Sequence, residues 1–193
     1  MITAAGLATR QRLLAAAREL IEEGGYGSAS VAAIAERAGV ASGTLYRHFL
    51  SKEELFLDVF REVCAGEERA MRASADNAGP GALDRLEAVL TTFARRALQN
   101  RSLAWALLAE PVDPVVDAER LAYRERYASL VAAELTAAVA VGEIPAQDVA
   151  FTAAALVGGC GEALVGPLSS VDGSDQVVAS IQTFVRRAIG AAG

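Results

Sequence analysis

The chain has 193 residues, of which 53% are hydrophobic, 22% are charged and 6% are aromatic. This composition excludes general disorder, because it supplies enough apolar surface for one medium domain or for a small domain joined to a larger one. The net charge of −6 argues against broad polyanion binding by the chain as a whole. Ala and Leu dominate the sequence, so we predict an almost wholly helical, all-α protein.

The negative charge is unevenly distributed along the chain. Residues 1–56 carry six Lys or Arg and six acidic residues, which leaves 12 of the 18 basic and 18 of the 24 acidic residues for the rest. All the excess negative charge therefore lies after residue 56. The neutral N-terminal segment leaves room for a local anion-binding face, which the acidic remainder does not favour.

Capping residues and glycines predict short helices in the N-terminal part. Thr9 is expected to cap a first helix, which ends at Gly24 and Gly25. Ser30 is expected to cap a second, short helix. Gly39 follows that helix at the position where a left-handed C-cap is needed.

A third short helix is expected over about residues 41–48, joined to the second through Gly39-Val40, so that the two form a helix-turn-helix. On a helical wheel, Leu45 and Phe49 share one face and are expected to be buried. The other side carries small and polar side chains. Small residues let the helix start approach a groove floor, and Tyr, His and Arg bond to phosphates or to a guanine edge.

The next helix start adds a second anion-binding feature. Ser51-Lys52-Glu53-Glu54 is a Ser-x-x-Glu capping box that opens a long helix to about Ala75. The free N–H groups and the positive dipole end of that helix favour a phosphate, and Lys52 adds a full charge. The start of the second helix, at Ser30, offers a similar site. The candidate DNA-binding residues are Ser30, Ser42, Gly43, Thr44, Tyr46, Arg47, His48 and Lys52.

Loop residues predict the later helices as well. After a loop at residues 74–81, helices are expected at about 82–100 and 102–110. Asp113-Pro114 opens a helix to about Val141, the next helix ends near Val165, and a last helix follows a loop at 166–174 and ends near Gly190. We therefore predict nine helices. They are divided into a helix-turn-helix domain at residues 1–51 and a larger helical domain at residues 52–193.

Residues 149–171 contain a single charged side chain, Glu162, and are long enough to span a bilayer. The segment is built mostly from Ala, Gly and Ser, and Pro167 and the central Glu also disfavour insertion. We expect instead a helix buried on several sides within protein. The N-terminus lacks the apolar stretch of a signal peptide, and Cys64 and Cys160 fit core thiols in a reducing compartment, so a cytoplasmic protein is expected.

Residues 30–55 closely resemble the DNA-binding domain of the TetR family of bacterial transcription regulators. The motif is present as Ile34-Ala35, Ala38-Gly39-Val40, Gly43-Thr44-Leu45-Tyr46, His48-Phe49 and Lys52. The resemblance is strong over about residues 9–60 and only architectural beyond them. It implies that residues 41–48 are the recognition helix and that the DNA contacts include Ser30, Thr44, Tyr46, His48 and Lys52.

The sequence departs from the family pattern at one position. The residue after Gly-Val is commonly Ser or Thr, and here it is Ala41. The change weakens the N-cap of the third helix by roughly 1 kcal/mol if Ser42 does not substitute. It removes any hydroxyl contact from that position without affecting the fold.

The resemblance also implies that the larger domain dimerises. A single helix-turn-helix reads few base pairs, so such proteins pair two half-sites across a two-fold axis. TetR-like proteins usually dimerise through their last two helices as a four-helix bundle, which implies a homodimer on a palindromic operator. The alternative is that both helices only build the core of one chain. The candidate interface residues are Ala150, Ala154, Gly158, Gly161, Val165, Val177, Ile181 and Phe184.

The second role that the resemblance implies is sensing of a small, largely apolar inducer, held in a cavity of the larger domain. Trp105 and Tyr127 are favoured lining residues, because each needs a polar partner when it is buried. Ordinary core packing is the alternative for every member of the set. The candidates are Phe93, Trp105, Leu108, Tyr123, Tyr127 and Phe151.

Other interpretations have less support in the sequence. Catalysis is not predicted, because the chain has one His and neither paired metal-ligand spacing nor a Gly-rich phosphate loop after a strand. No catalytic residue, metal or cofactor is expected. A purely structural helical module would not need the small, polar helix start or Lys52. At single positions, a solvated Arg47, a core-edge Tyr46, a gap-filling His48 and a Lys52 that only decorates a helix start remain alternatives.

We therefore expect a ligand-responsive transcriptional regulator, most simply a repressor, that binds a palindromic operator as a homodimer. The alternative is a DNA-binding regulator without a small-molecule inducer, controlled by a protein partner or by its expression level.

Overall fold

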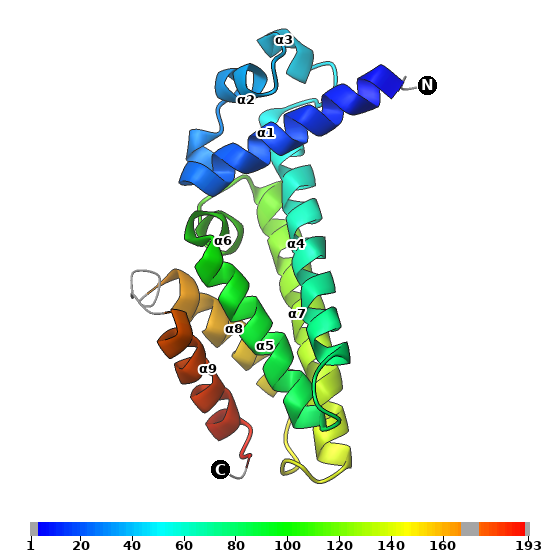
Figure 1. The fold of residues 1–193 in the computed structure, drawn as a ribbon, viewed down its shortest axis with the longest axis vertical. Helices are drawn as coiled ribbons and strands as arrows, with labels where there is room; N and C mark the ends of the chain where they lie inside the picture. The colour runs from blue at the N-terminus through cyan, green and yellow to red at the C-terminus, as the bar shows by residue number, and fades with distance from the viewer. Residues whose placement is uncertain (1–3, 167–173, 192–193) are drawn as a thin grey trace. The chain divides into compact units, whose positions relative to one another are not determined.

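The computed structural model describes residues 4–166 and 174–191, and within these ranges the chain forms nine helices and no strand (Figure 1). The all-α prediction is confirmed. Most of the loop predicted at 166–174 lies outside the described residues. The helices are α1 Ala4–Ser28, α2 Val31–Arg37, α3 Ser42–Leu45, α4 Lys52–Asp76, α5 Ala82–Gln99, α6 Arg101–Leu108, α7 Pro114–Ala140, α8 Val149–Val165 and α9 Ser174–Ala188.

The helices group into two compact units. The first contains the chain up to Val63 together with Asn100–Arg120, and the second contains Cys64–Gln99 and the chain from Leu121 onward. The boundaries of these units fall inside α4 and α7, so each of these helices contributes to both. The predicted domain boundary between residues 51 and 52 does not coincide with the boundaries of these units. It divides the chain by function, and it stays a prediction.

In the first unit, α1 packs against α2 and α6, and α2 packs against α3 (Figure 1). The apolar stripe of α1 is buried, with Leu13 and Ala17 fully inaccessible to solvent. The predicted N-cap at Thr9 is wrong, because α1 already begins at Ala4 and the Thr9 hydroxyl donates to the Ala5 carbonyl at 3.0 Å. Residues ahead of Thr9 continue the helix, and its hydroxyl is satisfied within the preceding turn.

The predicted break at Gly24-Gly25 is confirmed. Both glycines leave helical geometry, and Gly25 has a φ of +78°, a left-handed conformation that side chains with a Cβ rarely adopt. The Ser28 hydroxyl lies 2.7 Å from both the Leu20 and the Gly25 carbonyl oxygens and closes the turn after the break. The chain is thereby redirected from α1 into α2.

In the second unit, α5, α8 and α9 pack against one another (Figure 1). Cys64 and Cys160 are both buried and are not joined by a disulfide, as expected for core thiols. Burial raises the pKa of the Cys160 thiol to about 11, which makes the thiolate scarce at neutral pH. The core of this unit includes Leu86, Val89, Leu135, Leu156, Val177, Val178, Ile181 and Val185.

Within the described residues no helix is long and apolar enough to cross a membrane. The described part of the segment at 149–171 is α8, whose buried residues are Ala153, Leu156, Cys160 and Leu164. These four lie on one face at helical spacing, and much of the opposite face is exposed. The expectation of burial on several sides is therefore not met within the single chain, while Pro167 lies outside the described residues.

Candidate nucleic-acid interface

The turn between α2 and α3 is built as the sequence predicts. The Ser30 hydroxyl accepts a hydrogen bond from the Ala33 amide at 3.1 Å and caps α2. Gly39 adopts a φ of +66°, and the Val40 amide donates to the Ala35 carbonyl at 2.9 Å. These bonds satisfy the last carbonyls of α2 and set the start of α3.

Helix α3 is shorter than predicted. Regular helix covers Ser42–Leu45 rather than residues 41–48, and Ala41 at the N-cap makes no side-chain hydrogen bond, so the predicted loss of the cap is confirmed. After Leu45 the chain continues as a tight turn, in which the His48 amide donates to the Leu45 carbonyl at 2.9 Å. Leu45 and Phe49 are buried as predicted, and the Arg10 guanidinium lies 4.8 Å from the centre of the Phe49 ring.

The candidate DNA-binding residues divide into two groups by exposure. Ser30, Ser42, Gly43, Tyr46 and Arg47 are exposed, with the Tyr46 side chain 58% accessible. Thr44, His48 and Lys52 are half-buried. Burial of Leu45 and Phe49 behind this surface explains why the outward residues need not serve the core of the unit.

Gly43 is the most informative of the exposed positions. A Cβ added to it would meet no atom within 4 Å, so packing within the chain does not require a glycine there. Glycine costs about 0.5–1 kcal/mol relative to Ala inside a helix. Its presence at an exposed helical position is typical of a surface that a partner approaches closely.

Lys52 is held in place rather than extended into solvent. Its ammonium donates to the Tyr26 carbonyl at 3.2 Å and lies 3.9 Å from the centre of the Tyr26 ring. Partial burial lowers the pKa of Lys52 from its usual value, and the carboxylates of Glu53 and Glu110 oppose that shift. The Tyr26 ring itself packs on Phe56 at 4.3 Å between ring centres.

The capping box ahead of α4 forms with one difference. The Ser51 hydroxyl accepts from the Glu54 amide at 3.2 Å, as predicted. The Glu54 carboxylate accepts from the Leu50 amide, one residue before the amide that a capping box usually satisfies. The first turn of α4 is therefore fixed by its own cap, a few residues after the end of α3.

Sequence reasoning did not connect Tyr26 or Glu110 with this surface. The Glu110 carboxylate accepts hydrogen bonds from the Tyr26 amide at 2.8 Å and from the Gly27 amide at 3.1 Å. The break at Gly24-Gly25 signals a turn with free amides, but it does not reveal a partner more than 80 residues away along the chain.

The structure brings together only part of the predicted ligand-binding set. Phe93, Tyr123 and Tyr127 are buried in the second unit, and the Tyr127 ring centre lies 6.1 Å from each of the other two. The predicted polar partner of Tyr127 exists, because its hydroxyl donates to the Cys64 carbonyl at 3.1 Å.

The other predicted ligand-binding residues differ in position and exposure. Trp105 and Leu108 belong to the first unit. Trp105 is 45% exposed, so the burial on which its selection depended is absent, and Phe151 is 71% exposed.

The predicted dimer residues also divide by exposure. Ala150, Ala154 and Gly158 on α8 are exposed, and Gly161 and Val165 are half-buried. Val177 and Ile181 on α9 are buried within the single chain, so the structure corrects their placement: they pack inside the second unit and offer no surface to a second copy.

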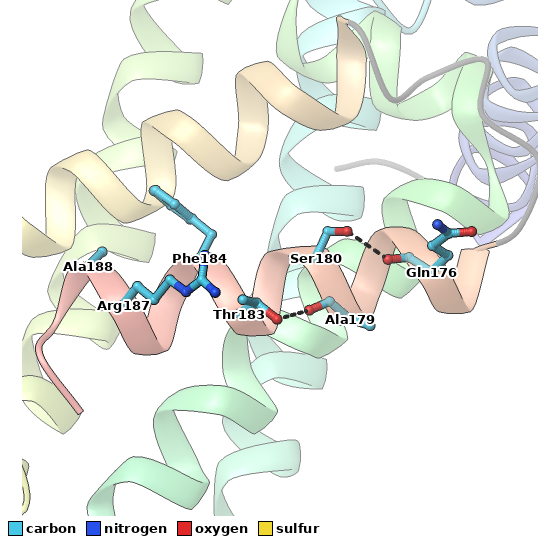
Figure 2. Close-up of a pocket in the computed structure, with 7 residues that line it drawn as sticks. All are labelled: Gln176, Ala179, Ser180, Thr183, Phe184, Arg187 and Ala188. Carbon is cyan, nitrogen blue, oxygen red and sulfur yellow. Dashed lines mark hydrogen bonds between the residues drawn. The ribbon is translucent and has the colours of Figure 1, made fainter. Parts of the chain in front are cut away.

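Phe184 keeps a 48% exposed side chain that projects toward α8, where its ring lies 3.8 Å from the position of a Gly159 Cβ (Figure 2). The exposed face of α9 forms an open hollow of about 660 Å³. Its lining residues are Gln176, Ala179, Ser180, Thr183, Phe184, Arg187 and Ala188.

Among the residues that the structure describes, no group of three or more His, Cys, Asp or Glu side chains is arranged to hold a metal ion. The surface that this site presents consists of small, hydroxyl-bearing and basic side chains at the end of a helix-turn-helix. A short second helix with such side chains on its outer face is typical of the helix-turn-helix class of DNA-binding proteins.

Comparison with known proteins narrows this class. The sequence model of the family described as "Bacterial regulatory proteins, tetR family" matches residues 13–59. The transcriptional regulator UidR of Escherichia coli strain K12 is 35% identical over 103 residues, covering 53% of this chain and 51% of that protein. The transcriptional repressor KstR of Mycobacterium tuberculosis is 31% identical over 140 residues, covering 72% of this chain and 61% of that protein.

Solved structures show the same fold over nearly the whole chain. FadR from Bacillus subtilis, solved in complex with stearoyl-CoA, superposes with a TM-score of 0.77 at 22% identity, covering 95% of this chain and 99% of that one. A tetR-family regulatory protein from Rhodococcus RHA1 gives a TM-score of 0.75 at 22% identity, with coverage of 96% and 98%.

Residues 13–59 therefore match the tetR family of bacterial regulatory proteins in sequence, and the chain shares its fold with solved regulators of that family. Its alignment with UidR spans about half the length of that curated relative.

Proposed function

We propose that the protein is a ligand-responsive transcriptional regulator, most simply a repressor, that binds a palindromic operator as a homodimer. The observation that carries the proposal is the surface of α3, where Gly43, Tyr46 and Arg47 are exposed in front of a buried Leu45. The small residues admit the helix start to the major groove, and the hydroxyl and guanidinium supply phosphate or base contacts. Residues 1–51 would bind DNA, and residues 52–193 would sense the ligand and dimerise.

Dimerisation would use α8 together with the exposed face of α9. The side chains of Ala150, Ala154 and Gly158 are small, which permits close approach of a second helix. Phe184 of α9 adds an exposed aromatic ring near Gly159 of α8. Pairing of two chains across a two-fold axis would place two α3 helices on two half-sites of one palindrome.

The inducer would be a small, largely apolar molecule. FadR was solved with stearoyl-CoA, so long-chain fatty acids and the acyl-CoA thioesters that carry the same apolar chain are the first compounds to test. The buried cluster of Phe93, Tyr123 and Tyr127 is an apolar region for such a ligand to enter. A ligand that prefers the DNA-incompetent state would release the operator by linkage.

A regulator without a small-molecule inducer is the second candidate. One observation favours it. The Tyr127 hydroxyl already donates a hydrogen bond to the Cys64 carbonyl, so it does not require a ligand as a hydrogen-bond partner. Thermal unfolding across a panel of acyl-CoA compounds separates the two candidates. A dose-dependent rise in the unfolding temperature supports an inducer, and its absence, with unchanged operator affinity, supports the second candidate.

The direct test of the proposal is fluorescence anisotropy of the purified protein with DNA from beside its own gene and from genomic selection, at two salt concentrations. Tyr46→Phe and Lys52→Ala are measured in parallel. We expect nanomolar, sequence-selective binding, which Lys52→Ala weakens for all sequences alike, with a smaller salt dependence. The absence of any sequence preference over random DNA, for protein shown by mass spectrometry to carry no ligand, would contradict the proposal.

A further inference from the structure

The side chain of Glu110, which follows the end of α6, is bound to the turn that ends α1. Its two carboxylate oxygens accept from the amides of Tyr26 and Gly27, at 2.8 and 3.1 Å. Both partners lie in the first unit, as does Lys52. A carboxylate on two backbone amides is a charge-assisted arrangement, stronger than a bond between neutral groups.

The Tyr26–Gly27 peptide group connects this carboxylate to Lys52. The amide of Gly27 and the carbonyl of Tyr26 belong to the same planar peptide unit. Glu110 accepts from its N–H, and the Lys52 ammonium donates to its C=O at 3.2 Å. Opposite charges at the two ends of one peptide polarise it in the same direction, so each hydrogen bond strengthens the other.

The surroundings of the peptide are shaped for this contact. A Cβ on Gly25 would lie 2.9 Å from the Glu110 carboxylate, so the carboxylate would have to shift away from the turn, and the φ of +78° also favours glycine at this position. The backbone of Glu110 is also held, because the Arg120 guanidinium donates to its carbonyl at 2.9 Å and to the Leu107 carbonyl at 2.8 Å. The backbone that carries the Glu110 side chain is therefore held by hydrogen bonds from Arg120.

Lys52 has a special place in the composition of the chain. It is the only lysine in the sequence, beside 17 arginines. An ammonium is a compact charge with three donor hydrogens, whereas a guanidinium is a planar fork. One donor on the Tyr26 carbonyl leaves two for a phosphate, and an ammonium 3.9 Å from the centre of the Tyr26 ring is fixed in direction as well.

We propose that Glu110 is a positioning residue for DNA binding: it orients the Tyr26–Gly27 peptide, which in turn holds the Lys52 ammonium in the position that binds a DNA phosphate. The inference rests on the proposed function, since it concerns a contact of the same DNA-binding surface. It assigns a role at that surface to an acidic residue whose charge alone would repel DNA.

A double-mutant cycle on operator binding tests the coupling. Glu110→Gln and Lys52→Met are each expected to weaken binding about tenfold, the effect of losing one charge-assisted contact. The double variant is expected to be no weaker than Lys52→Met alone. Independent, multiplicative losses in the double variant would overturn the proposal, because Glu110 would then not act through Lys52.

Glu36→Gln is the matched control for charge. Glu36 is an exposed residue of α2 in the same unit, so its substitution removes one negative charge near DNA without touching the turn. We expect unchanged or tighter binding. If Glu110→Gln also tightens binding, the carboxylate acts only as a repulsive charge, and the proposal is wrong. Where Glu110→Gln does not fold, Glu110→Asp replaces it, because the shorter carboxylate does not reach both amides.

A second measurement needs no DNA. Lysine labelled with ¹³C gives one side-chain spin system in this chain, so the pKa of Lys52 can be followed directly by NMR. Loss of the Glu110 charge is expected to lower that pKa further, because the carboxylate stabilises the ammonium, while Glu36→Gln leaves it unchanged.

An unaltered Lys52 titration in folded Glu110→Gln protein overturns the inference. Failure of the wild-type protein to select any DNA, with the titration shift intact, contradicts the proposed function instead.

Discussion

At the residue scale, the candidate DNA-binding surface of α3 consists of side chains that do not pack in the core. Tyr46 is 58% exposed, while Leu45 beside it is fully buried. The alternation follows from helical geometry, so the sequence was sufficient to predict which residues face outward. It was not sufficient to predict that Lys52 folds back on Tyr26, since that contact depends on where the last turn of α1, after the break at Gly24-Gly25, lies.

Gly43→Ala separates stability from DNA binding. Because the added Cβ meets no atom within 4 Å, we expect a free energy of unfolding that is unchanged or higher by up to about 1 kcal/mol, from the better helix propensity of Ala. Operator affinity should fall at least several-fold, because the methyl group occupies the closest approach to DNA. Denaturant unfolding and anisotropy measure the two quantities. A variant with full affinity would show that α3 does not approach DNA at Gly43.

Tyr127 predicts how stability depends on pH. Burial raises the pKa of its hydroxyl well above the usual value of 10. The unfolded chain therefore loses this proton near pH 10, while the folded chain keeps it. The contribution of Tyr127 to the free energy of unfolding is fully present below pH 10 and is lost as the pH rises above that value. Tyr127→Phe should reduce this alkaline decline.

The decline should not disappear in the Tyr127→Phe variant, because burial also raises the pKa of Tyr26, to about 12. At neutral pH the variant should lose about 1 kcal/mol, from the hydrogen bond to the Cys64 carbonyl. Urea unfolding at pH 7, 9 and 10.5 measures both effects. Identical pH profiles for the two proteins would mean that Tyr127 is accessible to solvent.

At the element scale, helix ends were predictable where a residue has a local conformational reason to end a helix. Gly25 and Gly39 adopt left-handed φ values, and Ser30 and Ser51 cap the helices that follow. The prediction failed at Thr9, where an apolar, Ala-rich start continues the helix. Helix α3 ends at Leu45 rather than near residue 48, and its N-cap residue makes no side-chain bond.

The end of α6 depends on an element far away in sequence. Arg120 of α7 donates to the carbonyls of Ala106, Leu107 and Glu110, carbonyls at the end of α6 or just beyond it. Arg120→Ala should cost about 2–4 kcal/mol of unfolding free energy, because hydrogen bonds to a charged group are lost and the carbonyls are left without that donor. No local pattern around residue 108 could have indicated this cap.

Trp105, the only tryptophan in the chain, lies in α6 and reports on this cap directly. Its fluorescence should change at lower denaturant concentration in Arg120→Ala than in the wild-type protein. Arg69→Ala, at an exposed position of α4, is the control and should leave the transition unchanged. Equal transitions for the two variants would show that Arg120 does not stabilise α6.

At the scale of the whole molecule, the all-α class and the nine helices of the described residues followed from the sequence, but the grouping of those helices did not. Each compact unit is assembled from two separate stretches of chain, and this requires knowledge of which helices pack together. The same reason explains the dimer residues. Helical spacing places Val177 and Ile181 on one stripe, yet only the structure shows that this stripe is buried against the chain's own helices.

Gly158→Leu tests dimerisation through α8. The position is exposed, and a Cβ there meets nothing within 4 Å, so the single chain should fold with its stability nearly unchanged. A second copy packing on this face would be displaced by the larger side chain. We expect monomers by analytical ultracentrifugation and operator affinity reduced by at least tenfold, because two half-sites are no longer bound together.

Ala73→Leu is the matched control for this prediction, because Ala73 is an exposed residue of α4. That variant should sediment as the wild-type protein does. A dimeric Gly158→Leu protein with unchanged affinity would show that copies associate through another face.

The position of the only lysine has a practical consequence for chemical labelling. Apart from the amino terminus, an amine-reactive reagent finds its one target at Lys52, whose ammonium lies over the Tyr26 ring beside the candidate DNA surface. Fluorescent esters, crosslinkers and amine coupling to a sensor chip would therefore all modify the surface under study. Attachment through an engineered thiol or a tag leaves that surface intact, and protection of Lys52 from acylation becomes a one-site footprint of bound DNA.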